Sequence, residues 1–250
     1  MNKDHDEIKK NVRESYSKFL EQGSCSCCSD SCCGSTDNAE DISKSVGYTD
    51  KDLGAVPGAA NLGFGCGNPV AIASLKEGET VLDLGSGAGL DAFLSAKQVG
   101  PKGRVIGIDM TQDMVERARK NAEEGGYMNV EFRLGEIEAL PVDDGSVDVI
   151  ISNCVINLSP DKAKVFKEAF RVLKPGGRMM VSDLVLKKEL PKDIKESVEA
   201  YASCIAGACL KEEYISHIKE AGFTGVRLLK DADYSEMKEY VTSITVSAVK

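Results

Sequence analysis

The sequence predicts an α/β fold in which a mostly parallel sheet is covered by helices on both faces. From residue 79 onward, short β-branched runs alternate with stretches of helical length, the pattern of strands joined by covering helices. A glycine-rich turn follows the first such run, as expected where a strand hands over to a helix. At 250 residues the chain is long enough for one such core with added segments.

Five runs are predicted to form strands, at residues 79–84, 104–109, 130–134, 147–152 and 178–184. Helices are expected between them, at residues 89–98, 111–124 and 161–173. Residues 173–177, which read Leu-Lys-Pro-Gly-Gly, end the last of these helices, because proline cannot continue the hydrogen-bond ladder and glycine accepts a positive φ. The C-terminal part adds a helix at 211–221 and strand-like runs at 225–230 and 240–249.

The N-terminal part divides into a helix and a cysteine-rich segment. Apolar side chains recur at helical spacing through residues 5–22, which predicts an amphipathic helix that caps the main domain. From Gly23 to about Asn38 the chain is rich in Ser, Cys, Gly and Asp. Such a stretch buries too little apolar surface to hold a fold unaided, so we predict a mobile loop.

Charge and cysteine content narrow the classes of function. The chain carries 31 Lys+Arg against 40 Asp+Glu, a net charge of −9, and an acidic surface repels the phosphates of nucleic acids. The N-terminus lacks the apolar stretch of a signal peptide, and no apolar run approaches the ~20 residues that span a bilayer. We therefore expect a cytoplasmic protein without nucleic-acid or membrane partners, whose nine cysteines serve metal, metalloid or redox chemistry rather than permanent disulfides.

The glycine-rich turn at residues 83–89 predicts a ligand site. Its spacing differs from the dinucleotide pattern, and the strand before it ends in Asp83, which repels a pyrophosphate but suits an amino-acid ammonium. A simple tight turn remains an alternative for this motif alone. Asp109, 20 positions after Gly89, closes the next strand, where a carboxylate can bind both ribose hydroxyls. Glu136 follows the third strand and can meet an adenine edge.

In this order the three motifs resemble the class I S-adenosylmethionine methyltransferases, over roughly residues 67–190. The resemblance implies a Rossmann-like fold with a seven-stranded sheet, and S-adenosyl-L-methionine rather than NAD as the cofactor. It implies the following cofactor-binding residues: Asp83, Gly85, Ser86 and Gly87 at the methionine end, Asp109 at the ribose, Met110, Glu136 and Ile137 at the adenine, and also Asn153.

The methyl acceptor is indicated by what the sequence lacks. Its only histidines are His5 and His217, so it offers no convincing general base, which oxygen and nitrogen acceptors usually need. Trivalent arsenic needs none, because its lone pair is free once thiolates hold the atom, and soft sulfur ligands suit it. Cys66, Cys154 and Cys204 are the candidate ligands, although each on its own also fits an inert buried thiol.

The segments around these cysteines, together with Gly47-Tyr48 and residues 159–162, resemble the arsenite methyltransferases over about residues 46–223. The resemblance implies that Cys66, Cys154 and Cys204 bind As(III). Our hypothesis is that arsenite arrives as a complex with small thiols and exchanges onto these sulfurs. The resemblance also implies a redox role for an N-terminal cysteine, for which Cys32 and Cys33 are our candidates, and a reductant such as thioredoxin or a glutathione-like thiol.

Two alternatives stay open. One is a methyltransferase for a carbon or oxygen acceptor such as a quinone precursor, with Asp183 or Tyr201 as polar partner. The other is a thiol-rich protein that binds zinc or copper through the cysteines of residues 25–33. On the main interpretation, residues 1–66 form an N-terminal helix, Cys-rich loop and lid, residues 67–190 the cofactor-binding core, and residues 191–250 complete the sheet and the arsenic site.

Overall fold

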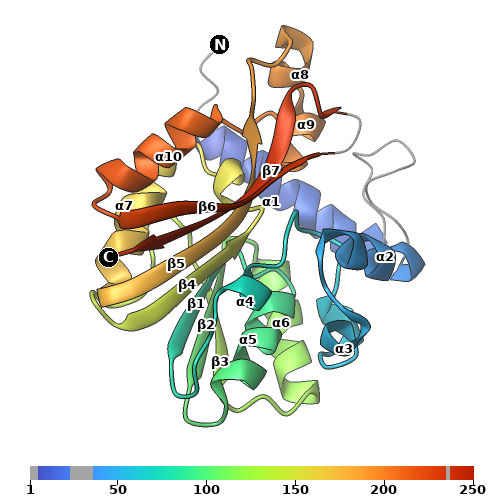
Figure 1. Cartoon of the computed structure of the whole chain (residues 1–250). Coiled ribbons are helices and arrows are strands. Elements are labelled where there is room, and N and C mark those ends of the chain that lie inside the picture. The colour runs from blue at the N-terminus through green and yellow to red at the C-terminus, as the bar shows by residue number, and fades with distance from the viewer. Residues whose placement is uncertain (1–4, 23–35, 235–236) are drawn as a thin grey trace.

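The computed structural model describes residues 5–22, 36–234 and 237–250 and has a seven-stranded sheet at its centre (Figure 1). Its strands are β1 (Thr80–Leu84), β2 (Arg104–Asp109), β3 (Val130–Leu134), β4 (Val147–Asn153), β5 (Leu173–Leu186), β6 (Thr224–Asp233) and β7 (Val241–Val249). They lie in the order β3-β2-β1-β4-β5-β7-β6. β7 is antiparallel to its two neighbours, and the other adjacent pairs are parallel. The predicted strands and the seven-stranded sheet are confirmed.

Helices cover both faces of the sheet (Figure 1). One face packs on α4 (Pro69–Ile72), α5 (Leu90–Val99) and α6 (Gln112–Glu124). The other face packs on α7 (Lys162–Val172) and α10 (Lys211–Glu220). Val81 and Leu82, successive residues of β1, belong to the two separate apolar clusters, since neighbouring side chains in a strand point to opposite faces. Burial on both faces explains why these strands read as nearly continuous apolar runs.

The largest differences from the predicted boundaries are at the start of β5 and at the end of the predicted loop. β5 begins at Leu173 rather than at residue 178, because Leu173 already pairs with Val147 before the register shifts. The helix α2 (Thr36–Val46) begins inside the segment predicted as a loop, so that prediction is wrong for residues 36–38. Residues 23–35, and with them the predicted mobility of the Cys-rich loop, lie outside the described residues.

Several short helices were not predicted, because a run of three to five residues is too short to show the ~3.6-residue period of apolar side chains that indicates a helix. They are α3 (Asp50–Leu53), α4, α8 (Lys192–Glu196), α9 (Val198–Ala202) and the 3-10 turns η1 (Gly58–Ala60) and η2 (Ile156–Leu158). No helix within the three described stretches of chain combines the length and the apolar character that crossing a bilayer requires.

The predicted N-terminal helix is α1 (His5–Gln22), which lies against α6 and α9. Its Val12 is buried in a third apolar cluster that also contains Cys66 and Cys204. The rings of Tyr16 and Phe19 lie 5.3 and 4.5 Å from that of Phe64, centroid to centroid. The helix therefore covers the loop that carries Cys66, as a cap on the main domain.

Candidate active site

The glycine-rich turn after β1 is a tight cradle of backbone amides. Gly85, Gly87 and Gly89 have φ values of 67°, 51° and 103°, in the region that favours glycine. The Gly87 amide donates to Oδ2 of Asp109 at 3.0 Å. A Cβ at position 85 would lie 2.2 Å from Cγ2 of Val155, so no other residue fits there without displacing the segment after β4.

Two buried carboxylates stand beside this turn, Asp83 at the end of β1 and Asp91 in the first turn of α5. Burial, together with the charges of Asp91 and Asp109, raises the pKa of Asp83 well above its ordinary value. Burial also raises the pKa of Asp91 to about 6. Oδ2 of Asp83 has no hydrogen-bond partner, and no lysine or arginine of the described chain forms an ion pair with either carboxylate. The site lacks a cation, so the ammonium group of S-adenosylmethionine fits it.

At the predicted ribose position, backbone amides fix the carboxylate of Asp109. Oδ1 of Asp109 accepts from the amide of Thr111 at 2.9 Å, while Oδ2 accepts from Gly87, which fixes the carboxylate at the end of β2. The Ser86 hydroxyl beside it is buried and lacks a partner. A buried polar atom without a partner costs free energy, and a bound ligand can satisfy it.

Two of the three residues predicted at the adenine, Met110 and Glu136, lie against α1. Met110 is half-buried and Ile137 is buried, which gives this part of the site apolar walls. Glu136 forms ion pairs with two side chains of α1, Lys9 at 2.7 Å and Arg13 at 3.6 Å. The prediction for Glu136 did not include these cations, because nothing in the local sequence relates residue 9 to residue 136.

Asn153 ends β4 and holds other protein groups in place. Its Nδ2 donates to the Tyr48 hydroxyl (2.9 Å), the Gly67 carbonyl (2.8 Å) and Oδ2 of Asp91 (3.2 Å), and its Oδ1 accepts from the amide of Cys66 (3.0 Å). Tyr48 in turn donates to Oδ1 of Asp91 at 2.7 Å. Tyr48 and Asp91 were not predicted as site residues; the one local signal is the position of Asp91 two residues after the glycine-rich turn.

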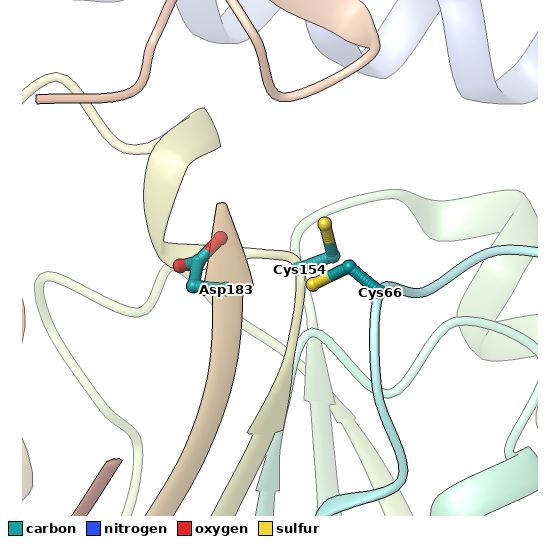
Figure 2. A group of neighbouring side chains, drawn as sticks. All are labelled: Cys66, Cys154 and Asp183. Atoms are coloured by element: carbon teal, nitrogen blue, oxygen red, sulfur yellow. The ribbon is translucent and has the colours of Figure 1, made fainter. Parts of the chain in front are cut away.

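Two of the three predicted arsenic ligands meet at the carboxyl edge of the sheet. The sulfur atoms of Cys66 and Cys154 and a carboxylate oxygen of Asp183 all lie within 4.8 Å of one another. Figure 2 shows Cys154 on the turn after β4, Asp183 on β5, and Cys66 on the loop that passes beside them. Three segments distant in sequence therefore bring their donor atoms to one point.

Cys204 approaches the same point from the turn after α9, although its sulfur is not part of that group. Its thiol donates to the backbone carbonyl of Cys154 at 2.8 Å. Cys154 and Cys204 have φ values of 58° and 65°, a backbone conformation that costs free energy for any residue except glycine and often marks a functional site. Burial raises the pKa of the Cys66 thiol, so it is protonated before any ligand binds.

Asp183 is fully buried and bound on both oxygens. Oδ1 accepts from Nδ2 of Asn157 at 2.8 Å and from the amide of Leu184 at 2.9 Å, and Oδ2 accepts from the Tyr214 hydroxyl at 3.1 Å. Burial raises the pKa of Asp183 to about 7, against the opposing effects of the Leu184 amide and the Lys162 charge. Its hydrogen bonds all point into the protein, which disfavours it as the polar partner of a carbon or oxygen acceptor.

The remaining residues considered for the site lie in different surroundings. Tyr201, the other polar candidate for such an acceptor, donates to the Leu158 carbonyl at 3.4 Å. Cys209 is half-buried and packs against the apolar cluster under α7 and α10, which fits a core residue rather than an arsenic ligand. Cys32 and Cys33 lie outside the described residues.

Comparisons with known proteins agree with this geometry. The family described as "Methyltransferase domain" matches residues 75–222. The arsenite methyltransferase of Halobacterium salinarum is 43% identical over 99% of this chain, and that of Homo sapiens is 41% identical over 66% of it. The crystal structure of an arsenic(III) S-adenosylmethionine methyltransferase from Chlamydomonas reinhardtii matches with a TM-score of 0.67 and 36% identity, over 84% of this chain and 73% of that one.

The coverage of the relatives is partial: the chain spans 68% of the Halobacterium relative and 46% of the human one. The match to the Halobacterium relative includes the cofactor cradle and all three predicted arsenic ligands, since it covers nearly the whole chain. This chain therefore belongs to the arsenite methyltransferase family, within the S-adenosylmethionine-dependent methyltransferases of class I.

Proposed function

We propose that this chain transfers methyl groups from S-adenosylmethionine to thiol-bound As(III) and so takes part in arsenic detoxification. The observation that carries the proposal is the meeting of the Cys66 and Cys154 sulfurs within 4.8 Å beside a cation-deficient cofactor cradle. The curated names of the relatives support the same activity. The sulfurs of Cys66 and Cys154 lie close together, and the thiol of Cys204 is bonded to the Cys154 carbonyl. Three such thiols suit a soft three-coordinate atom better than a carbon acceptor.

Arsenic is captured by thiol exchange. An arsenic(III) tris-thiolate exchanges its three small thiols for Cys66, Cys154 and Cys204, so each protein thiol loses one proton and each departing small thiol gains one. Before capture, the Cys204 thiol donates to the Cys154 carbonyl at 2.8 Å, so it gives up this hydrogen bond when it loses its proton to become the third ligand. The product of the exchange is neutral, which suits a buried site because a charged group there would be costly.

The chain's own residues then orient the reaction. When bound, S-adenosylmethionine supplies an electrophilic methyl group on a positively charged sulfonium. Asp83 and Asp91 hold its ammonium, Asp109 the ribose, and the three cysteines direct the arsenic lone pair toward the methyl group. Alignment of two bound reactants can contribute up to ~7 to 11 kcal/mol. Val12 of α1, which is buried in one apolar cluster with Cys66 and Cys204, excludes water and so favours loss of the sulfonium charge.

Each transfer raises the formal oxidation state of arsenic by two, so a trivalent product requires two electrons. Two protein sulfurs supply them by forming a disulfide: one leaves the arsenic as its As–S bond breaks, and the other is a free thiol that releases one proton. We assign one of these sulfurs to Cys66 and the other to the N-terminal cysteine cluster, where Cys32 and Cys33 remain candidates. A thioredoxin-type protein or a glutathione-like thiol then reduces the disulfide by exchange. This thiol requirement favours a cytoplasmic setting, where thiols are kept reduced.

The test is methyl transfer from labelled S-adenosylmethionine to arsenite in the presence of glutathione, with methylated arsenicals separated by chromatography. We expect product from the native chain, a loss of at least about 100-fold in Cys154→Ser, and little change in the control Cys209→Ser, since loss of a ligand misplaces the arsenic and a misplacement of about 1 Å can cost that much. Binding of S-adenosylhomocysteine checks that each variant keeps its cofactor site.

Three results would contradict the proposal. Cys154→Ser that methylates arsenite like the native chain would remove the thiols from the mechanism. Tight cofactor binding without any methylated arsenic would point to the carbon or oxygen acceptor. Stoichiometric zinc or copper binding without cofactor turnover would instead favour the thiol-rich metal-binding protein.

A further inference from the structure

The amide of Asn153 is the one described side chain that hydrogen-bonds to groups on both the cofactor side and the arsenic side of the site. Its Oδ1 accepts from the backbone amide of Cys66 at 3.0 Å, and its Nδ2 donates to the Gly67 carbonyl at 2.8 Å. On the other side, Nδ2 lies 3.2 Å from Oδ2 of Asp91 and 2.9 Å from the Tyr48 hydroxyl. Two N–H groups are thus shared among three acceptors.

Asp91 and Tyr48 connect this amide to the site of the cofactor ammonium. The Tyr48 hydroxyl donates to Oδ1 of Asp91 at 2.7 Å, and both residues are buried. Asp83, whose Oδ2 has no partner, is close enough to Asp91 for their charges to interact. A cation that binds Asp83 therefore attracts Asp91 as well, and changes the position or the strength of its bonds to Tyr48 and Asn153.

The loop that carries Cys66 follows any movement of Asn153, because it is packed against that side chain without free space. At Gly65, with φ at +124°, a Cβ would lie 2.7 Å from Nδ2 of Asn153. At Gly67 a Cβ would lie 2.6 Å from Oγ of Ser182 on β5. The carbonyl of Cys66 accepts from Oγ of Ser243 at 2.8 Å. The backbone of Cys66 is therefore held between Asn153 and β5–β7.

We propose that Tyr48, Asp91 and Asn153 form a relay that couples the two sites, so that occupation of the cofactor site tightens arsenic binding at Cys66 and the reverse. The three are positioning residues, since they act through the Cys66 backbone rather than on the reacting atoms. The inference rests on the proposed function, because the proposed function assigns arsenic to Cys66 as its ligand. Coupling of this kind ensures that both reactants are bound before methyl transfer begins.

The coupling is positive because each ligand removes part of the same freedom. A bound ammonium fixes Asp91, which fixes Asn153 and the Cys66 amide before arsenic arrives. Arsenic held by Cys66 fixes the same chain of bonds from the other end. The second ligand then binds to a site that is already ordered. By linkage, each ligand improves the affinity of the other by the same factor.

The test is calorimetric titration of the full chain with S-adenosylhomocysteine, with and without saturating arsenite in glutathione. For the native chain we expect arsenite to lower the Kd at least about fivefold, the lower end of typical coupling factors. The coupling ratio is the Kd without arsenite divided by the Kd with arsenite. In Tyr48→Phe this ratio falls to less than about twofold, whatever the effect on either Kd alone. The control is Tyr127→Phe, which also removes a tyrosine hydroxyl, here from a half-buried ring, and this hydroxyl donates to the Ala55 carbonyl and not to the relay.

A ratio is the appropriate measurement, since a variant that only loosens the fold weakens both titrations alike. If Tyr48→Phe does not fold, as judged by thermal unfolding, Asp91→Asn is the second variant, with the same expected loss of coupling. Arsenite protection of Cys66 against alkylation, mapped by mass spectrometry, shows independently that arsenic occupies the site.

The outcomes are distinct. A native ratio near one while arsenite protects Cys66 would overturn the relay and leave the proposed function standing. A ratio retained in Tyr48→Phe would assign the coupling to direct contact between the ligands and would also overturn the relay. Absence of protection at Cys66 would overturn the relay and the proposed function together.

Discussion

The thiol of Cys204 donates a hydrogen bond to the backbone carbonyl of Cys154 at 2.8 Å, and both residues adopt the left-handed backbone conformation, at φ 65° and 58°. The bond joins the turn after α9 to the turn after β4. On the proposed mechanism, Cys204 has two roles that substitution can separate. It stabilises the strained turn at Cys154 through its S–H group, and it supplies the third sulfur once arsenic binds.

Because the two roles of Cys204 are separable, two variants that are equally inactive should differ in stability. Cys204→Ser keeps a donor for the Cys154 carbonyl, so its free energy of unfolding stays within about 1 kcal/mol of the native value. Cys204→Ala leaves that carbonyl without a partner and loses about 1 to 3 kcal/mol. Urea denaturation measures both, and arsenite methylation is lost in both. Equal stabilities would show that the hydrogen bond contributes nothing.

Gly85→Ala tests the contact between the cofactor turn and the segment after β4. Its Cβ would meet Cγ2 of Val155 at 2.2 Å, whereas Gly78, which also has a positive φ, opens onto space without neighbours within 4 Å. Both substitutions cost about 1 to 2 kcal/mol for the left-handed backbone. Only Gly85→Ala also displaces Val155, and we expect it to weaken S-adenosylhomocysteine binding by tenfold or more, about 1.4 kcal/mol. Similar binding in the two variants would contradict the packing argument.

The affinity for S-adenosylhomocysteine depends on pH through Asp91, whose pKa burial raises to about 6. The ammonium binds the ionised carboxylate, so below that pH a proton must leave Asp91 before the ligand binds. The Kd therefore rises as pH falls through about 6, approaching tenfold per pH unit for each proton displaced. Titrations from pH 8 to pH 5 measure the slope. Asp91→Asn binds more weakly at pH 8 and has a flatter profile; an unchanged slope would assign the proton to another group.

Lys9 joins α1 to the adenine side of the site. It lies 2.7 Å from Glu136 and 3.1 Å from the buried carboxylate of Glu138, and its pKa is raised by hydrogen bonds to both, despite the opposing effect of burial, which is the largest. Lys9→Met leaves Glu138 without its cation, so we expect a loss of about 1 to 3 kcal/mol in unfolding free energy. The control is Lys10→Met, which affects one exposed pair with Glu14 at 3.8 Å and costs less than about 0.5 kcal/mol.

The sequence by itself determined the order of the strands along the chain and the cofactor cradle. These follow from local rules, because a strand is a short apolar run and a carboxylate such as Asp83 or Asp109 at its end reaches the carboxyl edge wherever the strand lies. The resemblance supplied Cys66, Cys154 and Cys204 as a set. Their spacing in the sequence contains no sign that their side chains meet.

The tertiary structure alone decided which side chains surround those cysteines. β4 and β5 are neighbours in the sheet, which brings Asp183 to Cys154, and α1 folds back over the edge, which brings Lys9 to Glu136. Tyr48 reaches Asn153 across 105 positions of the chain. Contacts at such separations depend on the packing of whole elements, whereas the patterns that predict a strand or a turn extend over only a few residues.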